Sequence, residues 1–211
     1  MATDFFPPIS QKIEKLLASL DSIPEERQRV LHALVDEVRA QRSAPPVQLQ
    51  FICTHNSRRS QFGQVWAAVA AAHFGVTGIK TYSGGTEATA CNPRTVAALR
   101  RAGFNVEPTP EGNSGENIRY SVRFAENHEA LTCFSKVFDH PENPSEDFTA
   151  VMTCGEADEA CPVIPGAKRI SLLYEDPKVA DDTPQESSHY DERSDQIGKE
   201  MLWVFRQVSS T

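Results

Sequence analysis

The sequence of 211 residues predicts an α/β fold: a four-stranded parallel sheet with helices on both faces, preceded by an N-terminal helical hairpin. After residue 46, short apolar strand patterns alternate with helical patterns, which is typical of a parallel sheet. Ligands bind such sheets at the carboxyl ends of the strands, so the polar residues that follow them should meet at one edge. We expect strands at 47–52, 79–83, 150–153 and 169–172, and helices at 61–73, 94–102 and 191–208.

Two amphipathic helical patterns precede the sheet, over residues 9–20 and 30–38. Ser22 and Glu25 between them match a capping box, which predicts the start of the second helix. The run Ser-Ala-Pro-Pro at 43–46 indicates a linker. We therefore expect a helical extension at 1–46 and the main domain at 47–211. The extension should pack on that domain or on a second copy of the chain, as a homodimer.

The remaining segments are less regular. Residues 120–124 and 131–138 are predicted to be extended, because apolar and β-branched residues dominate them. Residues 107–117 and 139–147 are rich in Pro, Gly, Asn and Glu, which favours surface loops.

Composition excludes several classes of protein. The net charge of −8 argues against a surface for nucleic acid. We see neither a leader peptide nor an apolar run long enough to cross a membrane, so we expect a cytoplasmic protein without a membrane partner. The five cysteines are too few for a disulfide scaffold, which favours catalytic or redox roles. Their spacing gives little support for a zinc site, and we expect no metal and no cofactor.

The run that begins at Cys53 carries the strongest functional signal. It has the form C-x5-R-S and lies between a predicted strand and a predicted helix, so backbone N–H groups and the positive helix end should converge on one point. Such a loop holds a tetrahedral oxyanion and favours a thiolate. The alternative is a buried, inert Cys53. With Cys53 as nucleophile, the expected oxyanion-binding residues are Thr54, His55, Asn56, Ser57, Arg58, Arg59 and Ser60.

Four members of this loop have distinct expected roles. Arg59 offers a forked, permanently charged donor, and Ser60 can donate to the thiolate. His55 stands where glycine would ease a tight backbone; it either projects outward or lies at the pocket rim and tunes the thiol. Arg58 is expected to extend the positive field rather than to contact substrate.

The run Tyr174-Glu175-Asp176-Pro177 offers a proton donor. Chemistry at a thiolate expels an oxygen leaving group that needs a proton. We expect Asp176 to supply it, on a loop that Pro177 stiffens. Glu175 is the rival donor, and a solvated acidic turn is the alternative reading.

Cys154 and Cys161 flank an acidic stretch that could form one helical turn. If that turn unwinds, the two thiols can meet in a transient disulfide, which suits a relay with Cys53. The alternative is two unrelated cysteines near a strand end. Cys91 and Cys133 lack a partner pattern and are interpreted as structural.

These residues together resemble the low-molecular-weight protein tyrosine phosphatase fold family, and most of all its thioredoxin-coupled arsenate reductases. The likeness covers most of 47–208, although 131–147 is unlike a compact member. It is carried by the runs CTHNSRRSQ at 53–61, YSGGTEATACNPR at 82–94 and CGEADEACP at 154–162, and by Asp176-Pro177 at the expected interval.

The resemblance implies a mechanism. The Cys53 thiolate attacks arsenate held by the loop amides and Arg59, while Asp176 protonates the leaving oxygen. Cys154 attacks the adduct and releases arsenite, Cys161 resolves the Cys53–Cys154 disulfide, and thioredoxin reduces the Cys154–Cys161 bond. A phosphatase of this fold would instead hydrolyse a phosphocysteine formed from a phosphate ester.

The chain also departs from the family pattern. The family loop usually has Gly at the position of His55 and Cys at that of Arg58. Gln64 stands where some reductases use a carboxylate to bind potassium, so we predict no potassium site. Lys178 and Val179 replace the aromatic residues that line the phenol groove of tyrosine phosphatases, which weighs against a phosphotyrosine substrate. A phosphatase and a non-enzymatic oxyanion-binding module remain the alternatives.

Overall fold

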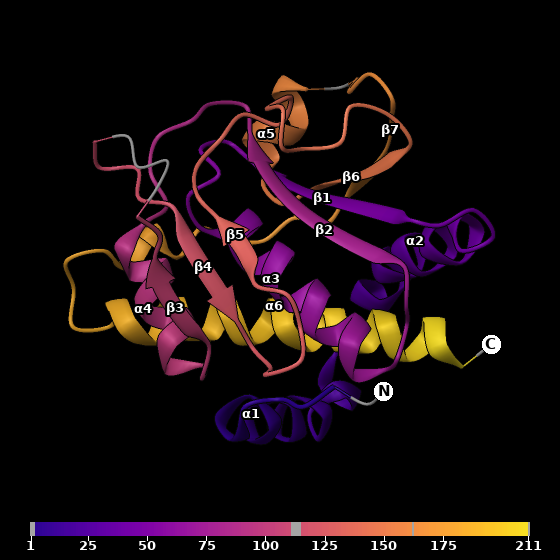
Figure 1. Ribbon diagram of the computed structural model, residues 1–211, viewed down its shortest axis with the longest axis horizontal. Helices are drawn as coiled ribbons and strands as arrows, with labels where there is room; N and C mark the ends of the chain where they lie inside the picture. Colours follow the sequence, from indigo (N-terminus) through magenta and orange to yellow (C-terminus); the bar gives the residue numbers. More distant parts are fainter. Residues whose placement is uncertain (1–2, 111–114, 162, 211) are drawn as a thin grey trace.

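The computed structural model describes residues 3–110, 115–161 and 163–210. Four parallel strands form the main sheet in the order β2-β1-β6-β7, which confirms the predicted sheet (Figure 1). Phe51 in the middle of the sheet aligns with Ser83 on one side and Val151 on the other. The strands are β1 (Val47–Cys53), β2 (Ile79–Gly85), β6 (Phe148–Met152) and β7 (Ala167–Ser171).

Helices cover both faces of this sheet, as predicted. Side chains of alternate residues point to opposite faces of a strand. Phe51 and Val151 accordingly join the large core under α3 and α6, whereas Ile52 and Met152 join a smaller cluster with Ala157 of α5. The sheet is therefore buried on both sides, which explains its continuous apolar strands. The helices of this part are α3 (Arg59–His73), α4 (Pro93–Arg101), α5 (Gly155–Ala160) and α6 (Glu186–Ser209).

The N-terminal segment contributes α1 (Pro7–Leu17), a 3₁₀ turn η1 (Leu20–Ser22) and α2 (Glu25–Gln41). Both helices pack on α6, and Figure 1 shows α1 running alongside it. Their apolar side chains belong to the same core as the main sheet. The segment thus packs on its own chain, whereas the domain boundary at residue 46, the hairpin arrangement and the homodimer stay predictions.

The predicted capping box is wrong. Ser22 belongs to the 3₁₀ turn, where its hydroxyl donates to the carbonyl of Ser19 at 2.7 Å. Pro24 is the N-cap of α2, and no side chain caps this end. A capping box would require Ser22 to be the N-cap of α2, but the N-cap lies two residues later, at Pro24.

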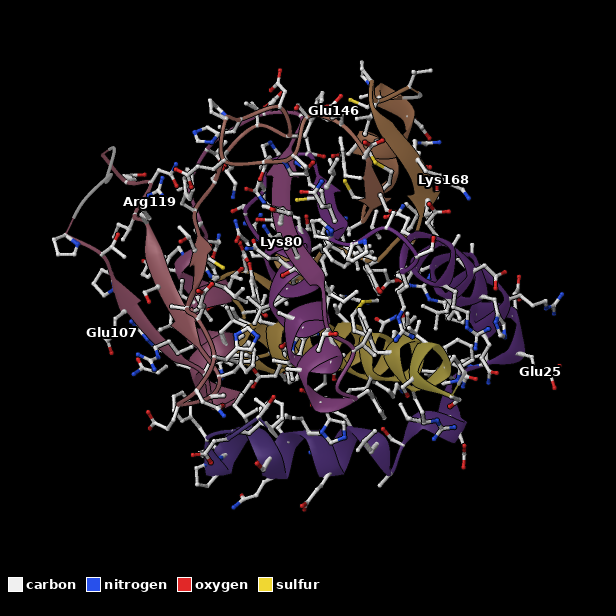
Figure 2. All side chains as sticks on the ribbon, turned by 45° about the vertical axis from the view of Figure 1, so that its right-hand side comes forward. Glu25, Lys80, Glu107, Arg119, Glu146 and Lys168 are labelled. Carbon is white, nitrogen blue, oxygen red and sulfur yellow. The ribbon has the colours of Figure 1, made fainter. Side chains whose placement is uncertain are left out.

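The far end of α2 is tied to the main sheet. Glu37 near this end forms an ion pair with Lys168 of β7. Figure 2 labels Glu25, where α2 begins, and Lys168, which projects from β7. No helix of the described residues is long and apolar enough to cross a membrane.

A second, antiparallel sheet lies beside β2 and was not predicted (Figure 1). It consists of β3 (Asn105–Pro108), β4 (Tyr120–Arg123) and β5 (Leu131–Cys133) in that order. The extended segment predicted at 131–138 is a strand only as far as Cys133, and Val137 then forms an isolated bridge to Gly85 of β2. Part of the loop predicted at 107–117 lies outside the described residues.

Candidate active site

The residues singled out in the sequence converge at the carboxyl ends of the strands. Cys53 is the last residue of β1, and Cys154 follows β6 by two residues. Thr54 Oγ1 lies 3.3 Å from Cys154 Sγ. Cys53 and Cys154 share one buried cluster, and Cys161 packs against it. The three thiols of the proposed relay are thus gathered in one region.

Asn56 and Ser60 form the interior of the loop. Asn56 has a positive φ of 47°, a conformation that Asn tolerates better than most residues. Its Nδ2 donates to Ser60 Oγ at 2.8 Å, and Ser60 Oγ lies 3.1 Å from Cys53 Sγ. Because an amide nitrogen only donates, Ser60 accepts that bond, and its own proton is free to be donated to the sulfur. The arrangement thus places the Ser60 hydroxyl beside the sulfur of Cys53.

Segments far away in the sequence hold the loop from outside. Asn56 Oδ1 accepts from the backbone N–H of Lys136 at 3.0 Å, and Ser135 Oγ donates to the carbonyl of His55 at 2.7 Å. On the other side, Ser57 Oγ donates to the carbonyl of Ala90 at 2.7 Å and its own carbonyl accepts from Asn92 N–H at 3.1 Å. The loop is therefore held in place by hydrogen bonds to segments on both of its sides.

Gly85 at the end of β2 allows this close packing. Its N–H donates to the carbonyl of Lys136 at 2.8 Å. A Cβ at this position would lie 2.7 Å from the carbonyl oxygen of Thr54 and 2.8 Å from the nitrogen of Asn56. Both are backbone atoms of the loop, so only glycine fits here without moving it.

Asp176 lies beside the loop and contacts Arg59. Nη2 of Arg59 donates to Asp176 Oδ2 at 2.6 Å, and Nη1 donates to the carbonyl of Tyr174 at 3.0 Å. The rival donor, Glu175, has a side chain 90% exposed that pairs with Arg193 at 3.2 Å. Of the two carboxylates, only Asp176 is thus within reach of the loop.

Arg58 points away from the loop interior. Its Nε donates to the hydroxyl of Tyr190 at 2.7 Å, and its Nη2 lies 3.5 Å from Asp181 Oδ2. Tyr190 in turn donates to Asp181 Oδ1 at 2.8 Å. Burial raises the pKa of Tyr190, so this hydroxyl remains a donor at neutral pH. Arg58 therefore connects the acid-bearing segment, residues 174–181, to α6. Its Nε lies 3.9 Å from Asp176 Oδ1.

His55 and Thr54 lie at the rim. The His55 ring is 44% exposed, and its Nε2 lies 3.7 Å from Glu87 Oε2. Thr54 Oγ1 donates to Glu156 Oε2 at 3.1 Å. The His55 ring thus points toward solvent, whereas the Thr54 hydroxyl lies between Glu156 and the buried sulfur of Cys154.

The short helix predicted between Cys154 and Cys161 is present as α5, with Cys154 at its N-cap. Seven residues at about 1.5 Å each separate the two Cα atoms by roughly 10 Å. A disulfide needs less than about 7 Å between its Cα atoms, so α5 must unwind before these cysteines can bond. All five cysteines are free thiols, and only Cys161 among them is partly exposed.

Cys91 and Cys133 lie in the large core, away from this cluster. Burial raises the pKa of Cys133 to about 12 and that of Cys91 still further. Neither forms a thiolate at neutral pH, in agreement with a structural role.

Sequence reasoning missed the outer supports of the loop, above all Ser135, Lys136 and Tyr190. No short motif marks them, because each acts from more than 75 residues away. Gln64, at the position considered for potassium, donates through Nε2 to the carbonyl of Thr132 at 3.2 Å. No group of three or more His, Cys, Asp or Glu residues in the described parts of the chain could hold a metal ion.

The site combines a thiol, an arginine, a carboxylic acid and a second thiol. No protein-family model matches the chain. Arsenate reductase of Bacillus licheniformis is 28% identical over 153 residues, 72% of this chain and 89% of the relative. Arsenate reductase of Bacillus subtilis is 27% identical over 155 residues, 72% of this chain and 91% of the relative.

The fold has a counterpart among solved structures. The solution structure of a low molecular weight protein tyrosine phosphatase from Bacillus subtilis matches 78% of this chain and 98% of its own, with a TM-score of 0.51 and 16% identity. The chain therefore has the low-molecular-weight protein tyrosine phosphatase fold, and in sequence it is a homologue of arsenate reductases.

Proposed function

We propose that this chain is a thiol-based arsenate reductase. The observation that carries the proposal is the position of Cys154, which shares a buried cluster with Cys53 and lies 3.3 Å from Thr54 Oγ1 of the loop. A phosphatase needs the nucleophile, the arginine and the acid, but no second thiol at this place. The curated relatives described above, which are named arsenate reductases, agree with it.

The first step is attack by the Cys53 thiolate on arsenate. A sulfur–arsenic bond forms and an arsenic–oxygen bond breaks. The loop amides and Arg59 balance the charge of the anion. Asp176 gives its proton to the departing oxygen, which leaves as water. The Ser60 hydroxyl can donate a hydrogen bond to the attacking sulfur, which lies 3.1 Å from its oxygen.

The second step reduces arsenic. The Cys154 thiolate attacks Cys53 sulfur, a disulfide forms, and the electron pair of the sulfur–arsenic bond passes to arsenic, which leaves as arsenite. Cys161 then attacks Cys154, which frees Cys53 and leaves a Cys154–Cys161 disulfide. This last exchange requires α5 to unwind, as argued above. A dithiol reductant of the thioredoxin type would supply two electrons to restore both thiols.

A phosphatase is the second candidate. Cys53, Arg59 and Asp176 suffice to form and hydrolyse a phosphocysteine, and the solved relative of this fold is a tyrosine phosphatase. The surface beside the acid gives little support for a phenol ring, because Val179 is 78% exposed and no aromatic residue follows Pro177 directly. A thioredoxin partner and a cytoplasmic location are part of the first proposal and remain predictions.

Replacement of Cys161 by Ser separates the two candidates. Arsenite release would be followed with thioredoxin, thioredoxin reductase and NADPH, beside hydrolysis of p-nitrophenyl phosphate by the same sample. For a reductase, Cys161→Ser limits arsenite release to about one equivalent per enzyme, whereas any phosphate ester hydrolysis is unchanged. Cys53→Ser is the control and abolishes both reactions.

Other outcomes contradict the proposal. Fast ester hydrolysis without arsenite from the wild type identifies a phosphatase. Turnover of neither substrate, combined with normal phosphate binding by Cys53→Ser, identifies an oxyanion-binding module.

A further inference from the structure

Arg27 of α2 reaches the core of the main domain through a buried ion pair. Its Nε and Nη2 donate to Oε1 and Oε2 of Glu200 in α6, at 3.0 and 2.8 Å. The Glu200 side chain is only 3% exposed, and Gln196 Nε2 also donates to it, at 3.1 Å. A forked guanidinium–carboxylate pair fixes both partners in direction as well as in distance. Arg27 therefore holds a defined position inside the protein.

Tyr174 packs on this ion pair. The guanidinium carbon of Arg27 lies 4.8 Å from the centroid of the Tyr174 ring, which is a cation–π distance. Tyr174 is buried, and its burial and then the charge of Glu200 raise the pKa of its hydroxyl well above the usual value. The uncharged ring of Tyr174 thus lies between Arg27 of α2 and the rest of the acid-bearing segment.

The backbone of Tyr174 connects this spacer to the site. Its N–H donates to the carbonyl of Thr153 at 3.1 Å, one residue before Cys154. Its carbonyl accepts from Nη1 of Arg59 at 3.0 Å. Asp176 follows two residues later, and Pro177 restricts the backbone after it. A displacement of Tyr174 would therefore move the acid relative to the catalytic loop.

We propose that the N-terminal segment 1–46 positions the catalytic acid, and that Arg27 is the positioning residue through Glu200 and Tyr174. The proposal rests on the proposed function, in which Asp176 is the proton donor. It gives α2 a role beyond filling the core, because the contacts from Arg27 lead directly to the acid-bearing segment. Misplacement of a catalytic group by about 1 Å can reduce a rate by two orders of magnitude, so such a support has kinetic consequences.

The test compares two arginines on the same helix. Arg39 also joins α2 to α6, through a 2.7 Å hydrogen bond from its Nη2 to the carbonyl of Gln207, but that contact does not involve the acid segment. We expect Arg27→Met to lower kcat for arsenate reduction by about tenfold or more with KM changed less than about threefold, whereas Arg39→Met leaves both unchanged. Arg27→Lys keeps the charge without the fork and should fall between them.

A second variant separates positioning from simple stability. Arg27→Met leaves the Glu200 carboxylate buried without its partner, which destabilises the protein. The double variant Arg27→Met/Glu200→Gln removes that charge, so its Tm should recover while kcat stays low. Recovery of kcat together with Tm would show that Arg27 only neutralises Glu200, and would overturn the proposal. Equal loss of kcat in Arg27→Met and Arg39→Met would overturn it as well.

Failure of the proposed function has a different signature. If the wild type turns over neither arsenate nor p-nitrophenyl phosphate, the proposed function fails and amide hydrogen exchange over residues 172–180 becomes the readout. Arg27→Met should then exchange faster in this segment than the wild type, and Arg39→Met should not. Identical exchange in all three proteins would overturn the positioning role without reference to activity.

Discussion

Asp176 and Arg59 are joined by a 2.6 Å hydrogen bond between Oδ2 and Nη2, at the edge of the catalytic loop. The same carboxylate accepts from the N–H of Lys178 through Oδ1, at 3.1 Å. The carboxylate is therefore held from both sides, by Arg59 and by the backbone of its own segment.

Replacement of Asp176 by Asn tests the acid. Asparagine keeps the shape of the side chain but has no proton to give, so we expect kcat to fall by about 10²- to 10⁴-fold. Steady-state kinetics of arsenite release measure this effect. Glu175→Gln is the matched control, because the Glu175 side chain is 90% exposed, and it should leave kcat unchanged. The opposite ranking of the two variants would assign the proton to Glu175.

Replacement of Ser60 by Ala tests the hydroxyl aimed at the nucleophile. A hydrogen bond to a charged group contributes about 1.5–3 kcal/mol, so its loss should slow the reaction of Cys53 with iodoacetamide at neutral pH by about tenfold or more. Mass spectrometry of the labelled Cys53 peptide measures the rate. An unchanged rate would mean that the loop amides alone keep the sulfur ionised.

Replacement of Gly85 by Ala tests the packing beneath the loop. The added methyl group would approach backbone atoms of Thr54 and Asn56 within 2.7 and 2.8 Å. We expect a loss of stability of about 1–3 kcal/mol, measured by urea denaturation, together with a loss of oxyanion binding. Gly155→Ala is the control for stability, since its added Cβ has no neighbour within 4 Å outside the adjoining residues and the backbone of its own helix. Equal stability of the two variants would contradict the expected clash.

The buried thiols predict a loss of stability at high pH. Burial raises the pKa of Cys133 from 9.0 to about 12, and that of Cys91 also rises. In the unfolded chain these thiols ionise near pH 9, so above that pH the unfolded state binds fewer protons and the free energy of unfolding decreases. At pH 10 the expected decrease is roughly 1 kcal/mol per thiol relative to pH 8, by urea denaturation. Cys133→Ala should show a shallower pH dependence, and an identical slope would refute this origin.

The local parts of the site could be predicted from the sequence. The loop that begins at Cys53 needs only a strand, a helix and a motif between them, and all three are contiguous in the chain. Asp176 is predicted as the acid from Pro177, from the Cys53 loop and from the interval between the two. The structure places this carboxylate, rather than that of Glu175, against Arg59. Cys154 and Cys161 were identified by their spacing, and the turn between them is helical as expected.

The supports of the site could not be predicted, for physical reasons. Ser135 and Lys136 act on the loop mainly through backbone groups or a single hydroxyl, which leave no pattern in composition or periodicity. The segments that contain β4 and β5 are predicted to be extended, but strands of four and three residues carry too short a pattern to reveal that they pair in a second sheet.

The place where the N-terminal helices dock could partly have been foreseen. On α6, Tyr190, Gly198 and Trp203 are buried together with Ile197, Met201, Leu202 and Phe205. A helix that is apolar on more than one side needs more than one covering element. The apolar residues on several sides of α6 indicate that further helices pack on it.

The hydrogen bond between Asn56 and Lys136 spans 80 positions of the chain. During synthesis, the strand and helix around Cys53 emerge long before the segment that completes the loop. A nascent chain that ends before residue 136 lacks this support, and the entropy of closing so long a segment opposes an early, ordered loop. If the loop binds anions as proposed, the growing polypeptide should thus acquire that affinity only after residue 136 has left the ribosome.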